Sequence, residues 1–447
     1  MPQARWRARC PERLSVATGD AILEWVMRGL WRLVAFALLV PVCTWAEPVA
    51  PLTLDQALDL LHHQNPELLA AALNIRAAHG DLVSARLLPN PTLSNQVGNF
   101  PLGQTNPPGL GVGQTVIEQV GLQEEIQLWG RRGARVSAAG AREAQATDER
   151  ADLERRLVFE TRSRFVAVLV TTERLRLARE NLDRYRETVR VSQERRKAGD
   201  ISPAELDKVS LEQRTFELEV ADAQTERTEA VAALLPLLGL DAGDVTVVGD
   251  LNPPPARTDV DALVGEALTR RPDLLALERA VEAADARLRL ARAERWPDPT
   301  VGVQYTHDQF TVSGDLPNSL GTSFSLPLPL FDRNQGQLER AEAEAMIARH
   351  ELDKTRLAIP QEVRTAVNTY QLASAQTRRY ETAYLSQAKE ALSGSEASYR
   401  EGAVSLLEFL EAERAYIQTQ RDHLKALLDA YVAAFGVASA AALDSPP

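Results

Sequence analysis

The chain has 447 residues, of which 25% are charged and 5% are aromatic, and its formal net charge is -12. This acidic balance argues against nucleic acid as a partner, because proteins that bind nucleic acid present basic surfaces to the phosphates. Long stretches rich in Ala, Glu, Arg and Leu are typical of long helices and coiled coils, so we expect a mainly helical protein.

The first 46 residues follow the order of a secretory signal peptide: positive charge, an apolar run, then small residues. Arg28 and Arg32 precede the apolar run 33–43, and cleavage is expected after Ala46. The run is too short to span a bilayer as a helix. We therefore expect residues 1–46 to be removed on export.

Two details of this segment stay open. Met27 is an alternative start, since a compact signal peptide would begin there. In a second interpretation Cys43 becomes a lipid-anchored N-terminus, although Val42 stands where a lipobox has a small residue. The chain has two cysteines, Cys10 and Cys43, so a chain cleaved after Ala46 would rely on neither disulfides nor thiol chemistry.

The rest of the chain is an internal duplication, in which matching motifs recur about 200 residues later. "NPEL" at 65–68 answers "RPDL" at 271–274, and "PNPT" at 89–92 answers "PDPT" at 297–300. A Gly- and Pro-rich linker separates the two copies. The expected divisions are a first repeat at 47–240, a linker at 241–258, a second repeat at 259–438 and a disordered tail at 439–447.

Each repeat predicts a helix, two strands, a long helix, a turn and a returning helix. The four expected strands cover approximately 91–100, 114–128, 299–309 and 318–330. The last is the clearest, because apolar residues alternate with small or polar ones from Leu320 onward. We expect Phe324 and Leu326 to face lipid, and Ser323 and Ser325 to lie on the opposite face.

The long helices carry coiled-coil patterning. The stretch 131–197 contains no proline and would span about 100 Å as one helix. Apolar and small residues recur at spacings of three and four along this stretch and along its returning partner. We therefore expect two helical hairpins, one in each repeat.

The same turn joins the long segments of both repeats. In each turn a Gly precedes a Ser by three residues and a Glu follows it by three: Gly199, Ser202 and Glu205, then Gly402, Ser405 and Glu408. Gly allows the backbone to leave one helix, Ser caps the next, and Glu completes a capping box.

Four short amphipathic strands cannot close a sheet within lipid, where every backbone polar group must be paired. Outer-membrane strands alternate apolar and polar residues over about ten positions, and these strands fit that pattern. We therefore expect several chains to pool their strands into one barrel in an outer membrane.

On these residues the sequence resembles the outer-membrane factor family, the TolC-like channels of tripartite efflux systems. The resemblance runs from Leu54 to Val437 and rests on the duplication, the "NPEL" and "RPDL" helices and the two Gly-x-x-Ser turns. "LWGRRGARV" and "PLPLFDRNQGQLERAEAE" are most similar to the heavy-metal, CzcC-like branch.

The resemblance implies a homotrimer that forms a 12-stranded β-barrel in the outer membrane of a Gram-negative bacterium and an α-helical barrel in the periplasm. It implies two partners, a periplasmic adaptor (membrane-fusion protein) and an inner-membrane pump of the resistance-nodulation-division type. The implied function is a passive conduit for divalent heavy-metal cations such as cobalt, zinc and cadmium. A channel for organic drugs or for a type I secretion substrate is the alternative.

By position, the resemblance also assigns residues at the periplasmic tips. The adaptor-docking residues are Gly199, Ser202, Gly402 and Ser405. The acidic ring at the entrance consists of Glu205, Glu408 and Glu411. Some relatives place an Arg near this tip where this chain has Val404, so the resemblance does not extend to a salt-bridge latch there.

The sequence contains no nucleophile–base arrangement, metal-ligand spacing or phosphate-binding loop, so we expect neither an enzyme nor a bound cofactor or metal. Trp129 and Trp296, near strand ends, are either interfacial anchors or packing residues. Two other classes stay open. A periplasmic coiled-coil adaptor or scaffold leaves the strands unexplained, and a secreted helical enzyme lacks a polar site.

Overall fold

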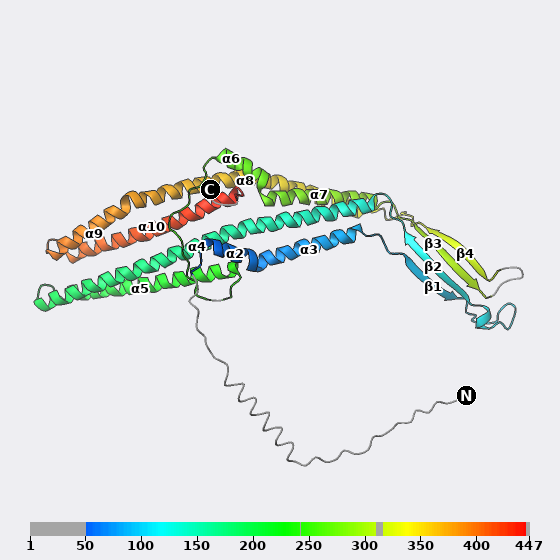
Figure 1. Cartoon of the computed structure of the whole chain (residues 1–447), viewed down its shortest axis with the longest axis horizontal. Coiled ribbons are helices and arrows are strands. Elements are labelled where there is room, and N and C mark those ends of the chain that lie inside the picture. The colour runs from blue at the N-terminus through cyan, green and yellow to red at the C-terminus, as the bar shows by residue number, and fades with distance from the viewer. Residues whose placement is uncertain (1–50, 242, 310–315, 444–447) are drawn as a thin grey trace, which may run out of the picture. The chain divides into compact units, whose positions relative to one another are not determined.

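A computed structural model describes residues 51–241, 243–309 and 316–443 (Figure 1). The expected signal peptide, residues 1–46, lies outside the described residues.

The described residues form two halves with the same order of elements. The first half contains α2 (Leu54–Gln64), α3 (Pro66–Arg86), β1 (Thr92–Gly98), η1 (Val112–Gln114), β2 (Ile117–Glu125), α4 (Arg131–Ala198), α5 (Pro203–Leu234) and η2 (Leu235–Leu238). The second half contains α6 (Val260–Arg270), α7 (Pro272–Ala293), β3 (Thr300–Asp308), β4 (Asn318–Ser325), α8 (Gln335–Arg379), η3 (Tyr380–Tyr384), α9 (Leu385–Arg400) and α10 (Leu406–Ala440). Within each half the order follows the prediction, except that two helices and not one precede the strands.

The long helical run that leads from the sheet to the turn differs between the two halves. α4 is one helix of 68 residues, as expected for the proline-free stretch. In the second half the corresponding run is divided, because the π-helical turn η3 separates α8 from α9. Pro360 lies inside α8 without ending it. The sequence pattern did not predict the π-helical turn.

The "NPEL" and "RPDL" motifs form the joint between the two short helices of each half. Pro66 and Pro272 take the first helical turn of α3 and α7, where a missing N–H costs nothing. Asn65 caps α3 by accepting its first backbone N–H groups. Its counterpart Arg271 has diverged, since its buried guanidinium instead pairs with Glu362 of α8.

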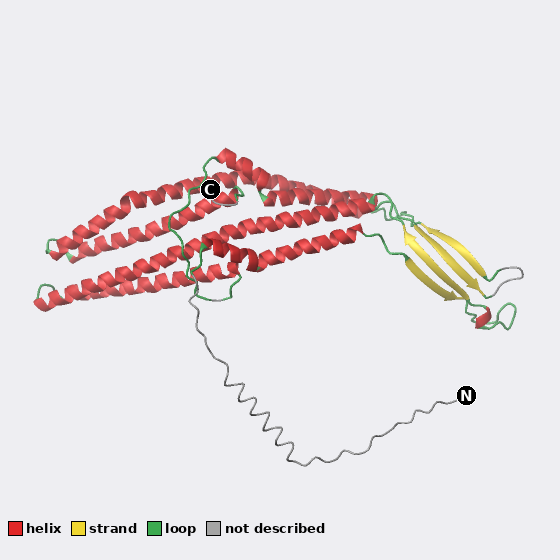
Figure 2. Ribbon diagram, in the orientation of Figure 1, coloured by secondary structure: helices red, strands yellow, loops and turns green. Residues whose placement is uncertain are grey.

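The four strands form one antiparallel sheet in the order β1-β2-β3-β4 (Figure 2). The pairing of β2 with β3 joins the two halves, with Leu122 opposite Val303. Within the described residues, β1 and β4 each pair on one side only, so the sheet has two open edges.

The strands are shorter than the sequence pattern predicts. β4 ends at Ser325, so the expected extension to 330 is wrong, and Leu326 lies just outside the strand. Pro327 and Pro329 explain this end, because proline has no N–H to donate to the sheet. At the start of β2, Gln114 belongs to the short helix η1 and not to the strand.

The chain stays ordered further toward its C-terminus than expected. α10 extends to Ala440, Ala441 is fully buried, and Leu443 packs against the same apolar cluster. The disordered tail expected at 439–447 is therefore wrong for 439–443, and 444–447 lie outside the described residues.

The buried side chains lie between helices. α4 is central, since it packs against α3, α5, α7 and α10, and Figure 1 shows it running beside α3 and α5. Within the described part of the chain, no helix packs across either face of the sheet. Most strand side chains are consequently exposed or only half-buried.

Candidate functional site

One face of the sheet carries nine exposed apolar side chains, and with them the polar residues Asn95, Glu118, Glu124, His307, Asn318 and Thr322. The register places on it Leu93, Val97, Val120, Leu122, Val301, Val303, Tyr305, Leu320 and Phe324. Each of these side chains is at least 37% exposed. Soluble proteins rarely expose a large contiguous apolar patch, so this face requires an apolar surrounding.

The opposite face is polar and closely packed. It carries Ser94, Gln96, Gln119, Gly121, Gln123, Gly302, Gln304, Thr306, Gly321, Ser323 and Ser325. A Cβ on Gly302 would lie 2.6 Å from Ser323 Oγ, and one on Gly121 would lie 2.9 Å from Ser94 Oγ. Glycine at these positions allows neighbouring polar side chains to lie across the sheet surface.

Asp298 ties the sheet to the long helices. Its side chain is 2% exposed, and its Oδ2 lies 2.6 Å from Nη1 of Arg131 at the start of α4. Its Oδ1 accepts the N–H of Leu128 at 2.9 Å. Sequence reasoning missed this residue. The signal that could have indicated it is the difference between "PDPT" and "PNPT". Asp298 can carry a negative charge, whereas Asn90, the equivalent residue of the first repeat, cannot.

Two tryptophans lie at the same junction. Their ring centroids are 5.7 Å apart, and Nε1 of Trp129 donates to the carbonyl oxygen of Pro297 at 3.3 Å. Trp129 is 56% exposed and Trp296 is 60% exposed. They therefore pack on each other and still present their rings at the surface.

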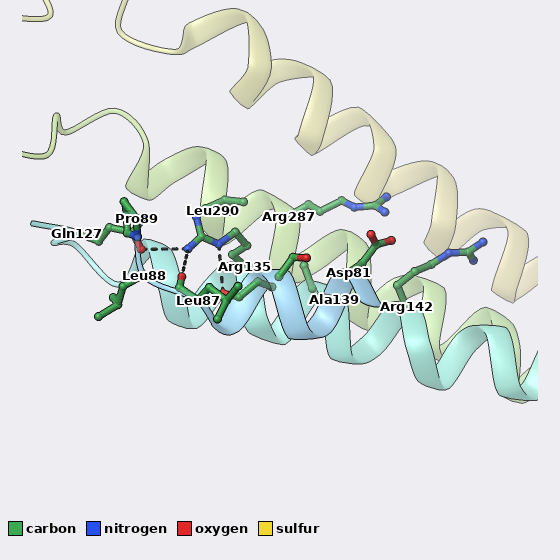
Figure 3. Close-up of a pocket in the computed structure, with 13 residues that line it drawn as sticks. Asp81, Leu87, Leu88, Pro89, Gln127, Arg135, Ala139, Arg142, Arg287 and Leu290 are labelled. Carbon is green, nitrogen blue, oxygen red and sulfur yellow. Dashed lines mark hydrogen bonds between the residues drawn. The ribbon is translucent and has the colours of Figure 1, made fainter. Parts of the chain in front are cut away.

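A cavity of about 560 Å³ lies between α3, α4 and α7 close to this junction (Figure 3). Arg135 of α4 donates to the backbone oxygens of Ala85 and Leu87, at 3.3 and 3.4 Å, and to Oε1 of Gln127 at 3.0 Å. It thereby satisfies carbonyl groups at the end of α3. These bonds commit Arg135 to holding the junction together.

The turn between α4 and α5 begins at a glycine with a positive φ and is closed by hydrogen bonds. Gly199 has a φ of +87°, and the N–H of Asp200 donates to the oxygen of Arg195 at 2.9 Å. Oγ of Ser202 accepts the N–H of Glu205 at 3.2 Å, and Oε2 of Glu205 accepts the N–H of Ser202 at 2.7 Å.

The turn between α9 and α10 repeats this geometry. Gly402 has a φ of +75°, and the N–H of Ala403 donates to the oxygen of Ser398 at 2.8 Å. Ser405 and Glu408 form the second capping box, with distances of 3.3 and 2.9 Å. Both capping boxes predicted from the sequence are confirmed.

The acidic residues of the tips remain accessible. Glu408 and Glu411 are exposed on α10, and a spacing of three residues puts them on one side of the helix. In the first turn, the hydrogen bond from the backbone of Ser202 holds the pKa of Glu205 below its ordinary value. The half-buried Val404 offers no charge to either group.

The family model for outer membrane efflux proteins matches two segments, 57–240 and 263–442, which together cover most of the chain. The chain belongs to the outer membrane efflux protein family. It is therefore a channel of the outer membrane of a Gram-negative bacterium and not an enzyme.

Individual members of this family are similar over most of their length. The cobalt-zinc-cadmium resistance protein CzcC of Cupriavidus metallidurans is 30% identical over 401 residues, covering 89% of this chain and 91% of CzcC. The pyoverdine export outer membrane protein OpmQ of Pseudomonas putida is 28% identical over 407 residues, covering 85% and 84%. The solved outer membrane protein VceC from Vibrio cholerae has a TM-score of 0.71 at 20% identity, covering 87% and 95%, and shares the fold.

Other chemistry in this efflux protein is limited. Across the described ranges, no group of three or more His, Cys, Asp or Glu side chains is placed to hold a metal ion. His62 lies 3.1 Å from Glu154, and His79 lies 2.8 Å from Glu143. Among the described helices, none has the length and apolar character that crossing a membrane requires.

Sequence reasoning also missed a buried polar group between the two helical hairpins of this efflux protein. Glu413 of α10 is 7% exposed, and Tyr185 of α4 is fully buried. His423 of α10 lines a cavity between α4, α9 and α10. Its Nε2 has no hydrogen-bond partner among the described residues and is 3.9 Å from Glu381. Nothing in the helical pattern distinguishes these residues from solvated ones.

Proposed function

We propose that three copies of this outer membrane efflux protein assemble into one channel. The observation that supports this proposal is the sheet, with its apolar face, its polar face and its two open edges. A sheet in lipid must close so that every backbone N–H and C=O is paired. Three four-stranded sheets supply 12 strands (3 × 4), whose polar face would line an aqueous interior. The long helices would continue the channel as an α-helical barrel through the periplasm.

The proposed partners act at the opposite ends of the helices from the sheet. The docking residues for a periplasmic adaptor are Gly199, Ser202, Gly402 and Ser405. Because both turns share one geometry, a trimer would offer the adaptor repeated, similar sockets. An inner-membrane pump of the resistance-nodulation-division type would deliver cargo through the adaptor.

The proposed entrance carries an acidic ring made of Glu205, Glu408 and Glu411. Rings of carboxylates favour cations and resist anions in a narrow aqueous pore. The exposure of Glu408 and Glu411 on one side of α10 supports this assignment.

The proposed cargo is a divalent heavy-metal cation such as cobalt, zinc or cadmium. The relative CzcC is named for resistance to these three metals. An organic substrate is the second candidate, because the relative OpmQ is named for pyoverdine export.

Deleting the gene in its native host tests the cargo. The deletion should lower the tolerated concentrations of cobalt, zinc and cadmium, and expression of the protein from a plasmid should restore them. Unchanged metal tolerance with new sensitivity to organic compounds would select the second candidate. A deletion strain that tolerates both classes like the parent would contradict both cargo assignments.

We also propose that residues 1–46 direct export and are then removed. The mass of the purified protein should match a chain that begins at Glu47. A lipid-modified N-terminal Cys43 would instead select the lipoprotein form.

A further inference from the structure

The α4–α5 hairpin and the α9–α10 hairpin pack on each other through one apolar cluster. It takes residues from all four helices: Leu182, Tyr185, Val189, Val209, Phe216, Leu392, Leu406, Phe409, Leu410 and Ile417. Two ion pairs seven residues apart flank the cluster and join α10 to α5. Arg414 pairs with Glu212, and Arg421 lies 3.4 Å from Glu219. The contact between the hairpins is therefore specific as well as apolar.

Two buried polar groups in this contact lack hydrogen-bond partners among the described residues. Oε2 of Glu413 and the hydroxyl of Tyr185 are buried, and neither has a hydrogen-bond partner within the described residues. Burying a charged carboxylate without a partner is costly. Burial accordingly raises the pKa of Glu413 to about 7, with Arg184 opposing the rise and Glu212 and Glu396 adding to it.

The charged groups that face Glu413 offset the cost of its burial only in part. On α4, the guanidinium of Arg184 donates to Asn181 and lies 5.8 Å from the ring of Tyr416. On α10, Arg414 gives both of its bonds to Glu212 of α5. α9 contributes Glu396, which has the same charge as Glu413. An ionised Glu413 would thus meet two carboxylates, one cation that is paired with Glu212, and Arg184, whose attraction offsets the burial only in part.

We propose that Glu413 is a proton-sensitive element of the contact between the two hairpins. The neutral acid lets α9–α10 pack on α4–α5, and the carboxylate loosens that packing because it needs water.

Imperfect packing next to Glu413 on α10 also favours a contact between the hairpins that can loosen. Oε1 of Gln420 and Nε2 of His423 are also buried without hydrogen-bond partners in the described structure. Both residues line a cavity of about 450 Å³ between α4, α9 and α10. Glu381 of the π-helical turn η3 lines the same cavity, and π-helical turns are places where helices depart from regular geometry.

The direction of the pH effect follows from proton binding. With hairpins packed, Glu413 holds its proton up to a pH of about 7, whereas an unburied Glu holds it up to a pH of about 4.5. The packed state therefore binds more protons between these two values. Packing is favoured fully below pH 4.5 and loses that contribution as the pH rises through 7.

Hydrogen–deuterium exchange of the purified full-length protein tests this directly. After correction for the intrinsic rate, peptides from α9 and the first half of α10 should exchange faster at pH 8 than at pH 6. Between pH 6 and pH 8 the expected change is about tenfold, because one proton with a pKa of about 7 in the packed state is lost over this range. Glu413→Gln cannot titrate and should lose this dependence. Glu390→Gln, an exposed substitution on α9, should retain it.

A second variant keeps the test possible if Glu413→Gln does not assemble. Glu413→Leu fills the same apolar site without a charge and should also exchange independently of pH. If both variants keep the dependence of the wild-type protein, or if the wild-type protein shows none, the proposal is wrong.

Conductance measurements provide a second test, which rests on the proposed trimeric channel. Wild-type trimers in a planar bilayer should open more often at pH 8 than at pH 6, and Glu413→Gln trimers should open equally at both. Absence of any conductance would contradict the proposed channel and would leave the exchange result to decide the role of Glu413.

Discussion

Asp298 and Asn90 occupy equivalent positions in the two repeats, yet only Asp298 is buried. Its carboxylate joins Arg131 at the start of α4 to the backbone that leaves β2. The same divergence separates Asn65, which caps a helix, from Arg271, which pairs with another helix. Single residues have thus given two copies of one motif different structural roles.

Asp298→Ala should destabilise the protein by about 3 kcal/mol, because it leaves the guanidinium of Arg131 without its carboxylate in a poorly solvated site. Chemical denaturation in detergent, followed by circular dichroism, would measure the loss. The matched substitution Asn90→Ala changes an exposed side chain and should cost under about 0.5 kcal/mol. Equal losses for both variants would contradict the role given to the buried pair.

Neutralising Glu408 and Glu411 together to Gln should reduce the cation preference of the channel, because carboxylates in a narrow pore attract cations. Gln keeps an oxygen that can accept the N–H of Ser405, so the capping box survives and is not the cause of any change. Reversal potentials in a planar bilayer under a salt gradient would measure the preference. Glu390→Gln provides the control for a lost charge elsewhere. A double variant with the parent's selectivity would show that Glu408 and Glu411 serve only the helix.

At the scale of elements, the end of β4 and the two tip turns follow local chemistry. β4 stops before Pro327, and both tip turns use a glycine with positive φ and a Ser–Glu capping box. The π-helical turn η3 has no equivalent in the first half, where α4 is unbroken. The two hairpins therefore share their tips but differ in how their outward helices are built.

Phe324→Arg should impair assembly, because it places a charge on the apolar face of β4. The cost is about 2–4 kcal/mol if the residue lies near the middle of the bilayer. Ser325→Arg, one residue further and on the polar face, should be better tolerated. The yield of folded protein in outer-membrane fractions would rank the two variants. The opposite ranking would mean that the face assigned to lipid is the interior face.

At the scale of the whole molecule, the open edges of the sheet are the feature that a single chain cannot resolve. Unpaired backbone groups on β1 and β4 cost several kcal/mol each in hydrocarbon. Pairing of the edges of neighbouring copies would satisfy these groups. The same argument makes a lone chain unstable in a membrane.

The protein purified in mild detergent should therefore have the mass of three chains, since edge pairing between copies is what completes the barrel. Native mass spectrometry would count the chains. Phe324→Arg should shift the population toward single chains, whereas Ser325→Arg should leave the trimer intact. A wild-type protein that remains a single chain while correctly folded in the membrane would contradict the proposed assembly.

Several features of this protein were determined by the sequence alone. The proline-free α4, the alternation in β4 and the two capping boxes each depend on residues close together in the chain, so local chemistry suffices to predict them. The duplication is visible because the same motifs recur in the second half of the sequence. For the same reason the sequence carried enough family pattern to indicate an outer-membrane efflux channel.

Only the tertiary structure decided the rest. Residues 439–443 of the expected tail are ordered because Ala441 is buried and Leu443 packs against residues distant in sequence. In the sequence, nothing distinguishes Asp298 and Glu413 from ordinary acidic residues. They become buried only when segments far apart in the chain pack together. Burial, and the protonation that follows from it, depends on those neighbours, and no local pattern contains them.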